Sequence, residues 1–260
     1  MSSVVILLAP SKTMDTHSPC PWPIIPTEPL FIDQAVKIAT KVRTLSTTKT
    51  MKLMGVSKPL AKTVQEYYRL WNVDAPGKPA LRAYTGDVYK GLQASTMSRE
   101  DADWAEQHLI IASGLYGLLR PYDGVQNYRL EMKAALPVGH RRNLYDFWRD
   151  SLMEYVQSRC ADWLCNCCSD EYARPVLTGL KLPVVTPVFM DTKPNGTVGV
   201  VPIYSKIMRG VFARWLIDNR IAQPEQMKKF RGHGYTYDDV RSRPNFPVFS
   251  RSMMVPLRFT

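Results

Sequence analysis

The sequence predicts a mixed α/β fold, one domain with a mixed central sheet that helices flank. Short apolar runs typical of buried strands alternate along the chain with longer segments of helical periodicity. Neither an internal repeat nor a linker divides the chain, and 260 residues suit one large domain. We therefore expect a single domain over residues 1–260, with a helical hairpin as a sub-element at about residues 46–71.

Composition bounds the class of protein. A hydrophobic fraction of 45% is ordinary for a globular fold, and no apolar run approaches the roughly 20 residues that a membrane-spanning helix needs. The apolar run near the N-terminus is short and lacks a basic region before it, so it predicts a strand rather than a signal peptide. We expect a cytoplasmic protein with no membrane partner. A net charge of +11, from 34 Lys and Arg against 23 Asp and Glu, favours polyanions or anionic substrates as partners.

The N-terminal third begins with a strand and continues with helices. "SVVILLAP" predicts a short strand that a proline ends, "SKTMD" a polar loop, and "PCPWPIIPTEP" an irregular segment. In "FIDQAVKIATKVRTL", apolar side chains recur at steps of three and four residues, which predicts a helix.

A glycine turn between two short helices is expected next, in "STTKTMKLMGVSKPLAKTVQEYYRLW". Ser46 and Ser57 are candidate N-caps, and Pro59 fits the first turn of the second helix. Such a helix-hairpin-helix can hold a DNA phosphate on its turn while lysines neutralise neighbouring phosphates. A purely structural hairpin would need the same glycine, so both interpretations stay open. The residues assigned to DNA are Lys49, Lys52, Gly55, Lys58 and Lys62.

The remaining elements alternate between strands and helices. "ALRAYTGDVYKGLQAST" predicts a strand-to-loop junction, and "SREDADWAEQHL" a helix capped by Ser98. "LIIAS", "WLCNCCS", "LPVVTPVFMD" and "TVGVVPIYS" predict strands, the last two joined by the turn "KPNG". "NLYDFWRDSLMEYVQSRC" and "KIMRGVFARWLIDNR" predict amphipathic helices. The tail after about residue 241 shows no clear period.

Polar groups collect after four predicted strands, in "APSKTMD", "TGDVYKG", "SGLYGLLRP" and "CSDEY". The carboxyl ends of strands in an α/β sheet meet at one edge, where ligands commonly bind. We therefore expect one pocket for an anion, with glycines that let the backbone approach it. The residues assigned to it are Ser11, Lys12, Asp87, Ser113, Gly114, Tyr116, Gly117, Arg120, Tyr128, Arg129, Tyr172, Lys206 and Arg209.

Three carboxylates near this pocket, Glu131, Asp170 and Glu171, are candidate general acids or bases if they are partly desolvated. Lys206 and Arg209 lie three residues apart near a helix N-terminus, where cations are disfavoured unless an anion is close. Alternatively, the carboxylates pair with the cations and merely hold loops together. Neither a phosphate-binding loop of the GxxxxGK[ST] type nor a dinucleotide fingerprint is present, so no cofactor is expected.

Cysteines and histidines predict no metal site. Cys165, Cys167 and Cys168 lie close together, yet a second pair of ligands with metal spacing is missing. Buried thiols on a strand explain the cluster as well as a redox or metal role does. The four histidines are far apart in sequence, so direct iron sequestration is the weakest of the hypotheses.

The distinctive segments of the chain are, in order, "APSKTMD", "YTGDVYKGLQA", "QHLIIASGLYGLLRPYDGVQNYRLEM", "NLYDFWRDSL", "SDEY", "PVFMDTK" and "YSKIMRGVFARWLI". Together they resemble the bacterial YaaA family of peroxide stress proteins, from near residue 4 to about residue 240. The resemblance implies a cytoplasmic protein that limits peroxide damage by keeping unincorporated iron low. It also implies DNA binding through a positively charged cleft and a helix-hairpin-helix, which falls on "LMGVSKPLA". The cysteines of "NCCSDEY" and the C-terminal tail depart from the family's pattern.

Two functions follow from these observations. The first is a DNA-binding protein of the oxidative stress response that recognises duplex or branched DNA without sequence preference. The second is an enzyme on a nucleotide-like or phosphorylated small molecule, for example one that cleaves or transfers at an N-glycosidic bond. In that case Tyr116 or Tyr172 would stack on a base.

Overall fold

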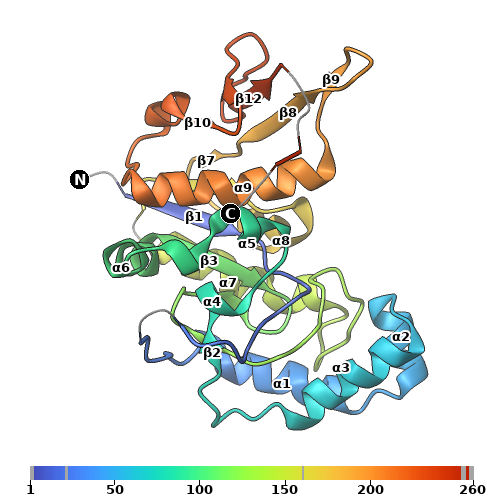
Figure 1. Cartoon of the computed structure of the whole chain (residues 1–260). Helices are drawn as coiled ribbons and strands as arrows, with labels where there is room; N and C mark the ends of the chain where they lie inside the picture. The colour runs from blue at the N-terminus through green and yellow to red at the C-terminus, as the bar shows by residue number, and fades with distance from the viewer. Residues whose placement is uncertain (1–2, 21–22, 160, 253–255, 258–260) are drawn as a thin grey trace.

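A five-stranded mixed sheet runs through the middle of the molecule (Figure 1). The computed structural model describes residues 3–20, 23–159, 161–252 and 256–257. Strand order is β4-β3-β1-β6-β7, and β1 lies at the centre. The strands span Val4–Leu8 (β1), Leu109–Ser113 (β3), Gly117–Leu119 (β4), Trp163–Cys167 (β6) and Val184–Val185 (β7). The predicted α/β class is confirmed.

Strand β1 pairs in parallel with both of its neighbours. Its register places Leu7 opposite Ile110 of β3 and Asn166 of β6, and β6 continues in parallel to β7. Only β4 runs antiparallel, to β3. All five residues of β1 are buried, as expected of a strand with both faces covered.

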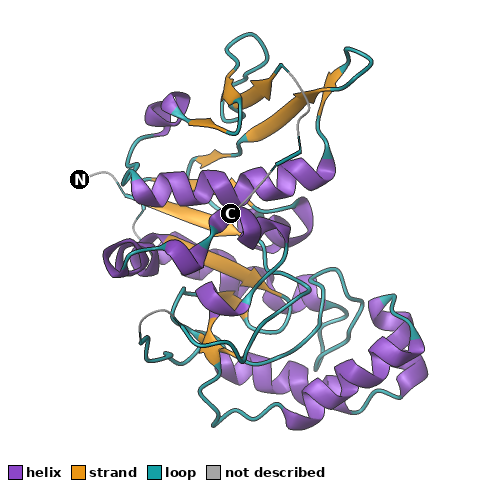
Figure 2. Ribbon diagram, viewed as in Figure 1, coloured by secondary structure: helices purple, strands orange, loops and turns teal. Residues whose placement is uncertain are grey.

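Helices supply that cover on both faces (Figure 2). Helices α6 (Arg99–His108) and α9 (Pro202–Asp218) contact β1, whereas α7 (Leu144–Ser158) contacts β4 and α8 (Asp170–Leu177) contacts β3. Ser98 caps α6 as predicted, because its hydroxyl accepts a hydrogen bond from the Asp101 amide. None of the helices in the described part of the chain combines the length and the apolar character that crossing a bilayer requires.

The predicted helical hairpin is present at the lower end of Figure 1. It comprises α2 (Thr47–Met54) and α3 (Lys58–Leu70), and α1 (Ile32–Arg43) packs against α3. Ser46 caps α2 by accepting from the Lys49 amide, and Gly55 ends it in the left-handed conformation at φ 61°. The capping serine and the turn glycine that the sequence indicated therefore set the two ends of α2.

The strand predicted for "ALRAY" is wrong, and "TVGVVPIYS" is a strand only at Val198–Gly199, because Pro202 begins α9. "ALRAY" forms the short helix α4 (Ala80–Ala83), and "DVYKGL" forms α5 (Asp87–Leu92), so a helix rather than a strand leads into Asp87. Alanine and leucine favour a helix here, and Gly86 begins the next one. A short ladder of β2 (Lys78–Pro79) and β5 (Gly124–Val125) precedes α4, and the 3₁₀ turn η1 (Ala94–Thr96) follows α5.

Helices α5 and α9 touch backbone to backbone. A Cβ on Gly91 would lie 2.1 Å from the Ile207 carbonyl oxygen, and a Cβ on Gly210 would lie 1.7 Å from the Val88 carbonyl oxygen. Glycine is therefore required on both helices at this crossing. The contact brings the N-terminal half of α9 beside α5.

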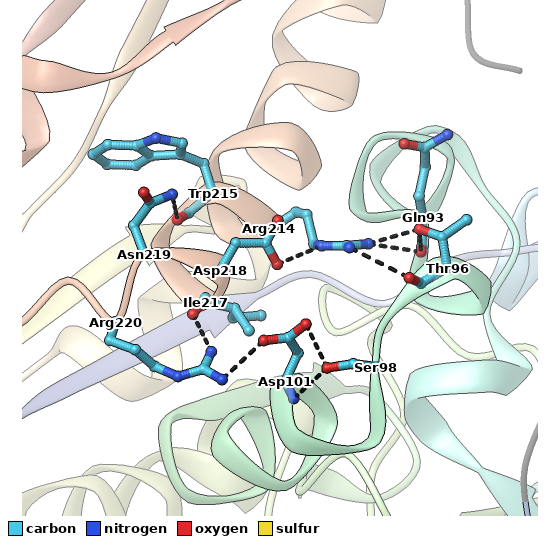
Figure 3. Close-up of polar contacts among 10 residues, drawn as sticks. All are labelled: Gln93, Thr96, Ser98, Asp101, Arg214, Trp215, Ile217, Asp218, Asn219 and Arg220. Atoms are coloured by element: carbon cyan, nitrogen blue, oxygen red, sulfur yellow. Dashed lines mark hydrogen bonds and ion pairs between the residues drawn. The ribbon is translucent and has the colours of Figure 1, made fainter.

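Two arginines fix the other end of α9, as Figure 3 shows. Arg214 donates to Asp218 (2.6 Å), to the Gln93 carbonyl (3.1 Å) and to the Thr96 hydroxyl (2.8 Å). Arg220 donates to Asp101 at the start of α6 (2.8 Å). These bonds tie α9 to both α6 and the η1 turn.

The C-terminal part of the chain forms a second mixed sheet, in the order β10-β11-β12-β8-β9. Its strands are β8 (Val188–Thr192), β9 (Val198–Gly199), β10 (Arg231–Gly232), β11 (Tyr235–Tyr237) and β12 (Val248–Arg251), with the 3₁₀ turn η2 (Pro224–Lys229) between α9 and β10. The tail without a visible period thus supplies β12, which pairs in parallel with β8. Phe189, Phe212, Phe230 and Phe249 pack together beneath this sheet.

A buried ion pair joins its strands. Asp191 of β8 is fully buried, and its carboxylate accepts from Arg251 Nε of β12 (2.5 Å) and from the Tyr235 hydroxyl of β11 (2.9 Å to each oxygen). The Arg251 guanidinium also stacks over the rings of Tyr204 and Tyr235 at 4.8 Å. One carboxylate therefore holds three strands in register.

Replacing that carboxylate tests its importance. Asp191→Asn keeps the side-chain shape but leaves the Arg251 charge buried without its counter-ion, so we expect a loss of about 3–5 kcal/mol in the free energy of unfolding. Urea titration followed by circular dichroism measures it. Asp150→Asn, which removes an exposed partner of Arg141 and Arg149, is the control and should change stability by less than about 1 kcal/mol. Equal stability of the two variants would contradict the assignment.

Candidate functional site

Three of the predicted polar tails do meet at one edge of the first sheet. Because β1, β3 and β6 are parallel, the segments that begin at Ala9, Gly114 and Cys168 all leave from the same side. The segment around residues 128–131 crosses this edge. A small pocket of about 10 Å³, the strand-edge pocket, lies there. Its lining is Pro10, Ser11, Lys12, Tyr128, Arg129, Leu130, Glu131 and Tyr172.

Glu131 is the centre of the charges in this pocket. Its carboxylate lies 2.5 Å from Lys12 Nζ, 3.3 Å from Lys133 Nζ and 3.9 Å from Arg129 Nη2. Burial opposes its ionisation, but the hydrogen bond and charge of Lys12, followed by those of Lys133, outweigh burial and lower the pKa of Glu131. The group is thus held as a carboxylate, which suits a base or an electrostatic role better than an acid.

Glu171 extends the same ion-pair cluster. Its carboxylate lies 3.7 Å from Lys133 Nζ and accepts from the Lys133 backbone amide at 3.4 Å. The hydrogen bond to Glu131 and the charges of both glutamates raise the pKa of Lys133. Asp170, the third candidate acid, is exposed at the first residue of α8.

Buried tyrosines form the floor beneath these charges. The Tyr128 hydroxyl lies 2.7 Å from Ser113 Oγ and 2.8 Å from the Tyr84 hydroxyl, and Tyr89 donates to the Ala9 carbonyl at 3.0 Å. Burial raises the pKa of Tyr84, Tyr89, Tyr128 and Tyr172, so all four stay neutral hydroxyls. Ser113 and Tyr128 are therefore structural partners of each other, and Tyr128 also lines the pocket.

The other predicted ligand residues, Asp87, Lys206 and Arg209, do not line the pocket. Gly86 packs so tightly on Ser11 that a Cβ there would lie 2.2 Å from Ser11 Oγ, which places Asp87 beside the loop after β1. Asp87 pairs with Lys90 at 3.4 Å. Arg209 acts electrostatically on the Cys168 thiol at the end of β6, and Lys206 is exposed on α9.

Three residues assigned to the pocket have packing roles instead. Tyr116 is 1% exposed and its hydroxyl accepts from Trp71 Nε1 at 2.8 Å, so it cannot stack on a ligand. A Cβ on Gly114 would strike the Leu130 carbonyl, and one on Gly117 would strike Trp148. These glycines admit neighbouring protein atoms rather than a ligand.

The four lysines of the hairpin are all exposed, and so is Gly55 at its turn. The amide of Val56 donates to the Met51 carbonyl, and the first intrahelical bond of α3 runs from Ala61 to Ser57. The Ser57 side chain makes no capping bond. The start of α3 therefore presents backbone donors next to Lys58.

Comparison with known sequences identifies the family. Residues 4–241 match the profile described as peroxide stress protein YaaA. The chain belongs to the YaaA family. It is 39% identical to UPF0246 proteins of Ruegeria pomeroyi and Burkholderia vietnamiensis, each alignment covering 95% of this chain and 98% of the relative. A UPF0246 protein of Bordetella pertussis is also 39% identical, over 95% of this chain and 99% of its own length.

Three cysteines of this YaaA-family chain, Cys165, Cys167 and Cys168, are buried side chains of β6 and the residue after it, whereas Cys20 is half-buried in the segment after β1. Cys165 and Cys167 lie on one face with their sulfur atoms 3.8 Å apart, and burial raises the pKa of the Cys165 and Cys168 thiols. Thiols in this state react slowly. Cys160 and residues 21–22 of the proline-rich segment lie outside the described residues, and within the described ones no three His, Cys, Asp or Glu side chains form a group that could hold a metal ion.

Arg120 does not reach the strand-edge pocket. It follows β4, which runs antiparallel to β3 and so returns the chain to the opposite edge of the sheet. There Arg120 donates to Asp123 (2.7 Å) and lies 3.8 Å from Glu106 of α6. The prediction that Arg120 grips the same anion as Lys12 is wrong.

Glu106 has a shifted pKa in this separate network. Burial, with a contribution from the charge of Asp123, raises the pKa of Glu106 to about 7, although the Tyr122 amide and Arg120 favour the carboxylate. The unfolded chain would ionise this group near 4.5. Below that pH the protonated group contributes its full stability, and the contribution is lost as the pH rises through 7.

We expect Glu106 to impose a pH dependence on stability. Between pH 5 and pH 8 the free energy of unfolding should fall by on the order of 2–3 kcal/mol more in the native chain than in Glu106→Gln. Urea titrations at four pH values measure the difference. Glu66→Gln, which alters an exposed pair with Arg69, serves as the control and should follow the native curve. Parallel curves for the native chain and Glu106→Gln would refute the shift.

Proposed function

We propose that this YaaA-family chain binds DNA through the phosphate backbone, with the α2–α3 hairpin as its main contact. The observation that carries the proposal is the glycine turn at Gly55 with four exposed lysines around it. Two of them, Lys49 and Lys52, lie on α2, and Lys58 and Lys62 lie on α3. Charges distributed over two helices suit an extended phosphate backbone better than a single point anion.

The N-terminus of α3 strengthens the site. The first backbone N–H groups of a helix have no intrahelical acceptor and lie at the positive end of its dipole, which favours a phosphate. Pro59 lacks an N–H, so the amides of Lys58 and Leu60 are the donors available within the first turn. Backbone donors recognise any phosphate, and binding should therefore not depend on base sequence.

DNA binding agrees with a role in peroxide stress. In the proposed role the protein acts in the cytoplasm, associates with duplex or branched DNA and limits the damage that hydrogen peroxide and free iron inflict on it. The net charge of +11 supports association with a polyanion without specifying the surface. The hairpin supplies that surface.

Salt dependence tests the proposal. Each lysine that neutralises a phosphate steepens the fall of log K with log salt by about 0.9. Replacing Lys49, Lys52, Lys58 and Lys62 together with glutamine should therefore flatten the slope by about 3–4 and weaken binding at low salt. Fluorescence anisotropy with a labelled duplex at several salt concentrations measures both quantities.

A matched control removes the same charge elsewhere. Lys193, Lys228 and Lys229 are exposed on the second sheet and its connections, and Lys181 is exposed on the loop between α8 and β7. The second sheet lies at the end of the molecule opposite the hairpin in Figure 1. The quadruple glutamine variant of these four lysines should keep most of the slope. If both quadruple variants lose the same affinity, net charge rather than the hairpin explains binding.

We propose a second function on the strength of the strand-edge pocket, an enzyme that acts on a nucleotide-like molecule. Glu131 is a carboxylate held ionised between Lys12, Arg129 and Lys133, and Tyr172 lines the same pocket. A carboxylate so placed can stabilise an oxocarbenium-like state during N-glycosidic cleavage, while the cations bind phosphate. The pocket would have to open, because Lys12 and Glu131 now fill it.

Product analysis tests this second function. Nucleoside mono- and diphosphates incubated with the protein should release free base, detected by chromatography and mass spectrometry. Glu131→Gln should lower the rate at least about 100-fold, because it removes the charge that stabilises the transition state. Asp170→Asn, which changes an exposed carboxylate outside the pocket lining, should leave the rate within a few-fold. The absence of any released base would exclude cleavage of these substrates.

A further inference from the structure

Arg129 is the cation of the strand-edge pocket that its neighbours neutralise least. Lys12 Nζ and Lys133 Nζ lie 2.5 and 3.3 Å from the Glu131 carboxylate, within ion-pair distance. Arg129 Nη2 lies 3.9 Å from the same carboxylate, which is too far for a hydrogen bond. Arg129 Nε is buried, and it donates to no acceptor in the described part of the chain.

A buried guanidinium N–H without an acceptor is costly, because it has lost its contact with water and gained no partner. In folded proteins an ordered water or an ion usually satisfies such a group. Nε and one Nη of an arginine form a planar fork that matches two oxygens of a phosphate or a carboxylate. The Arg129 Nε therefore marks a place where an external acceptor would bind.

The charges around the pocket favour an anion over a water molecule as that acceptor. Three positive charges, on Lys12, Arg129 and Lys133, face two negative charges, on Glu131 and Glu171. One positive charge of this cluster is thus left without a counter-ion. Because the Arg129 side chain is only 20% exposed, an anion beside it would be screened less by water than at an open surface.

The backbone around Arg129 is held in place. The Tyr68 hydroxyl of α3 donates to the Arg129 carbonyl at 3.4 Å, and Tyr128 and Leu130 on either side are buried. A Cβ on Gly114 would lie 2.3 Å from the Leu130 carbonyl oxygen, so this segment also packs tightly against the loop after β3. The Arg129 side chain therefore starts from a fixed position at the pocket.

Lys12 closes the pocket in this structure. A volume of about 10 Å³ has room for about one water molecule and none for a phosphate. The Lys12 side chain is 58% exposed, so it can turn away from Glu131 at the small cost of an ion pair that water screens. Glu131 would keep Lys133 as its counter-ion. Movement of one flexible side chain therefore opens space beside Arg129.

We propose that Arg129 binds the phosphate group of the substrate in the strand-edge pocket, and that Glu131 is an internal anion from which this phosphate displaces Lys12. In the bound state the Arg129 fork faces two phosphate oxygens, and Lys12 turns from Glu131 to a third. Arg129 then determines specificity for a phosphorylated molecule. The choice of a phosphate rests on the second proposed function, whereas the roles of Arg129 and of the Lys12–Glu131 pair come from their geometry.

Inorganic phosphate is the probe for Arg129, because it is small and presents the group in question. Isothermal titration calorimetry with the full chain, in a buffer free of other oxyanions, measures its dissociation constant. Arg129→Met should raise that constant at least about tenfold, because it removes the fork. Arg149→Met removes the same charge from an exposed position on α7 and should leave the constant unchanged. Equal losses in both variants, or no binding to the native chain at tens of millimolar phosphate, would overturn the proposal.

Glu131→Gln tests the displaced carboxylate. The substitution keeps the side-chain shape and frees Lys12, so phosphate should bind at least about threefold more tightly than to the native chain. Unchanged or weaker binding would mean that Glu131 does not compete with the ligand, which contradicts the proposal. If Arg129→Met fails to fold by circular dichroism, Arg129→Lys replaces it, with an expected loss of about threefold or more, because an ammonium cannot bridge two oxygens.

Base release and DNA binding, measured on the same variants, separate this inference from the proposed functions. A chain that binds phosphate through Arg129 but releases no base keeps the inference and loses the second function. Base release with an unchanged KM in Arg129→Met keeps that function and overturns the inference. Arg129→Met should retain the affinity for duplex DNA, because the hairpin lysines are unaltered. A loss of DNA affinity together with phosphate binding would assign the phosphate to a DNA strand, which contradicts a small-molecule ligand.

Discussion

The parallel pairing of β1 with both β3 and β6 is the constraint on which the functional part of this structure depends. It sends three loops out at one edge, so that Lys12, Ser113 and Cys168 leave neighbouring strands on the same side. The loop after β1 then turns back along α4, where the Asp15 amide bonds to the Ala83 carbonyl and the Thr85 amide to the Thr13 carbonyl. This one loop lines two pockets, because Lys12 lines the strand-edge pocket and Asp15 lines a cavity beside α4 and α5.

A wall of neutral hydroxyls separates the two pockets. Tyr84, Tyr128 and Ser113 form a chain of short hydrogen bonds, and Ser113 is fixed in turn by the Leu115 and Tyr116 amides. Because burial keeps these phenols protonated, the wall carries no charge that would neutralise the lysines on either side.

The sequence predicted what local signals determine. Ser46, Gly55 and Pro59 set the helical hairpin, and Ser98 set the start of α6, because capping and turns depend on neighbours within a few residues. The sequence also placed Lys12, Glu131 and Tyr172 near one edge of the sheet, because the carboxyl ends of parallel strands all lie at the same edge. The position of Arg120 was predicted wrongly because the chain reverses direction in the three residues between Ser113 and Gly117. The amino-acid composition of a short strand does not show whether it runs parallel or antiparallel to its neighbour. The second sheet escaped prediction because β12 pairs with β8 some 60 residues earlier.

Three groups of positive charges in the described part of the chain differ physically, and the net charge does not show the difference. Lys12 and Lys133 are committed to Glu131, so an incoming phosphate must displace a carboxylate before it gains their attraction. Lys78 is 8% exposed and lies 3.7 Å from Asp15, so its desolvation is a cost of folding that this carboxylate offsets. The hairpin lysines form no ion pair with any described residue, and they remain hydrated, which favours a long polyanion that releases its counterions. The location of each cation, more than the total of +11, therefore distinguishes the surface that we propose for DNA from the strand-edge pocket that we propose for a small molecule.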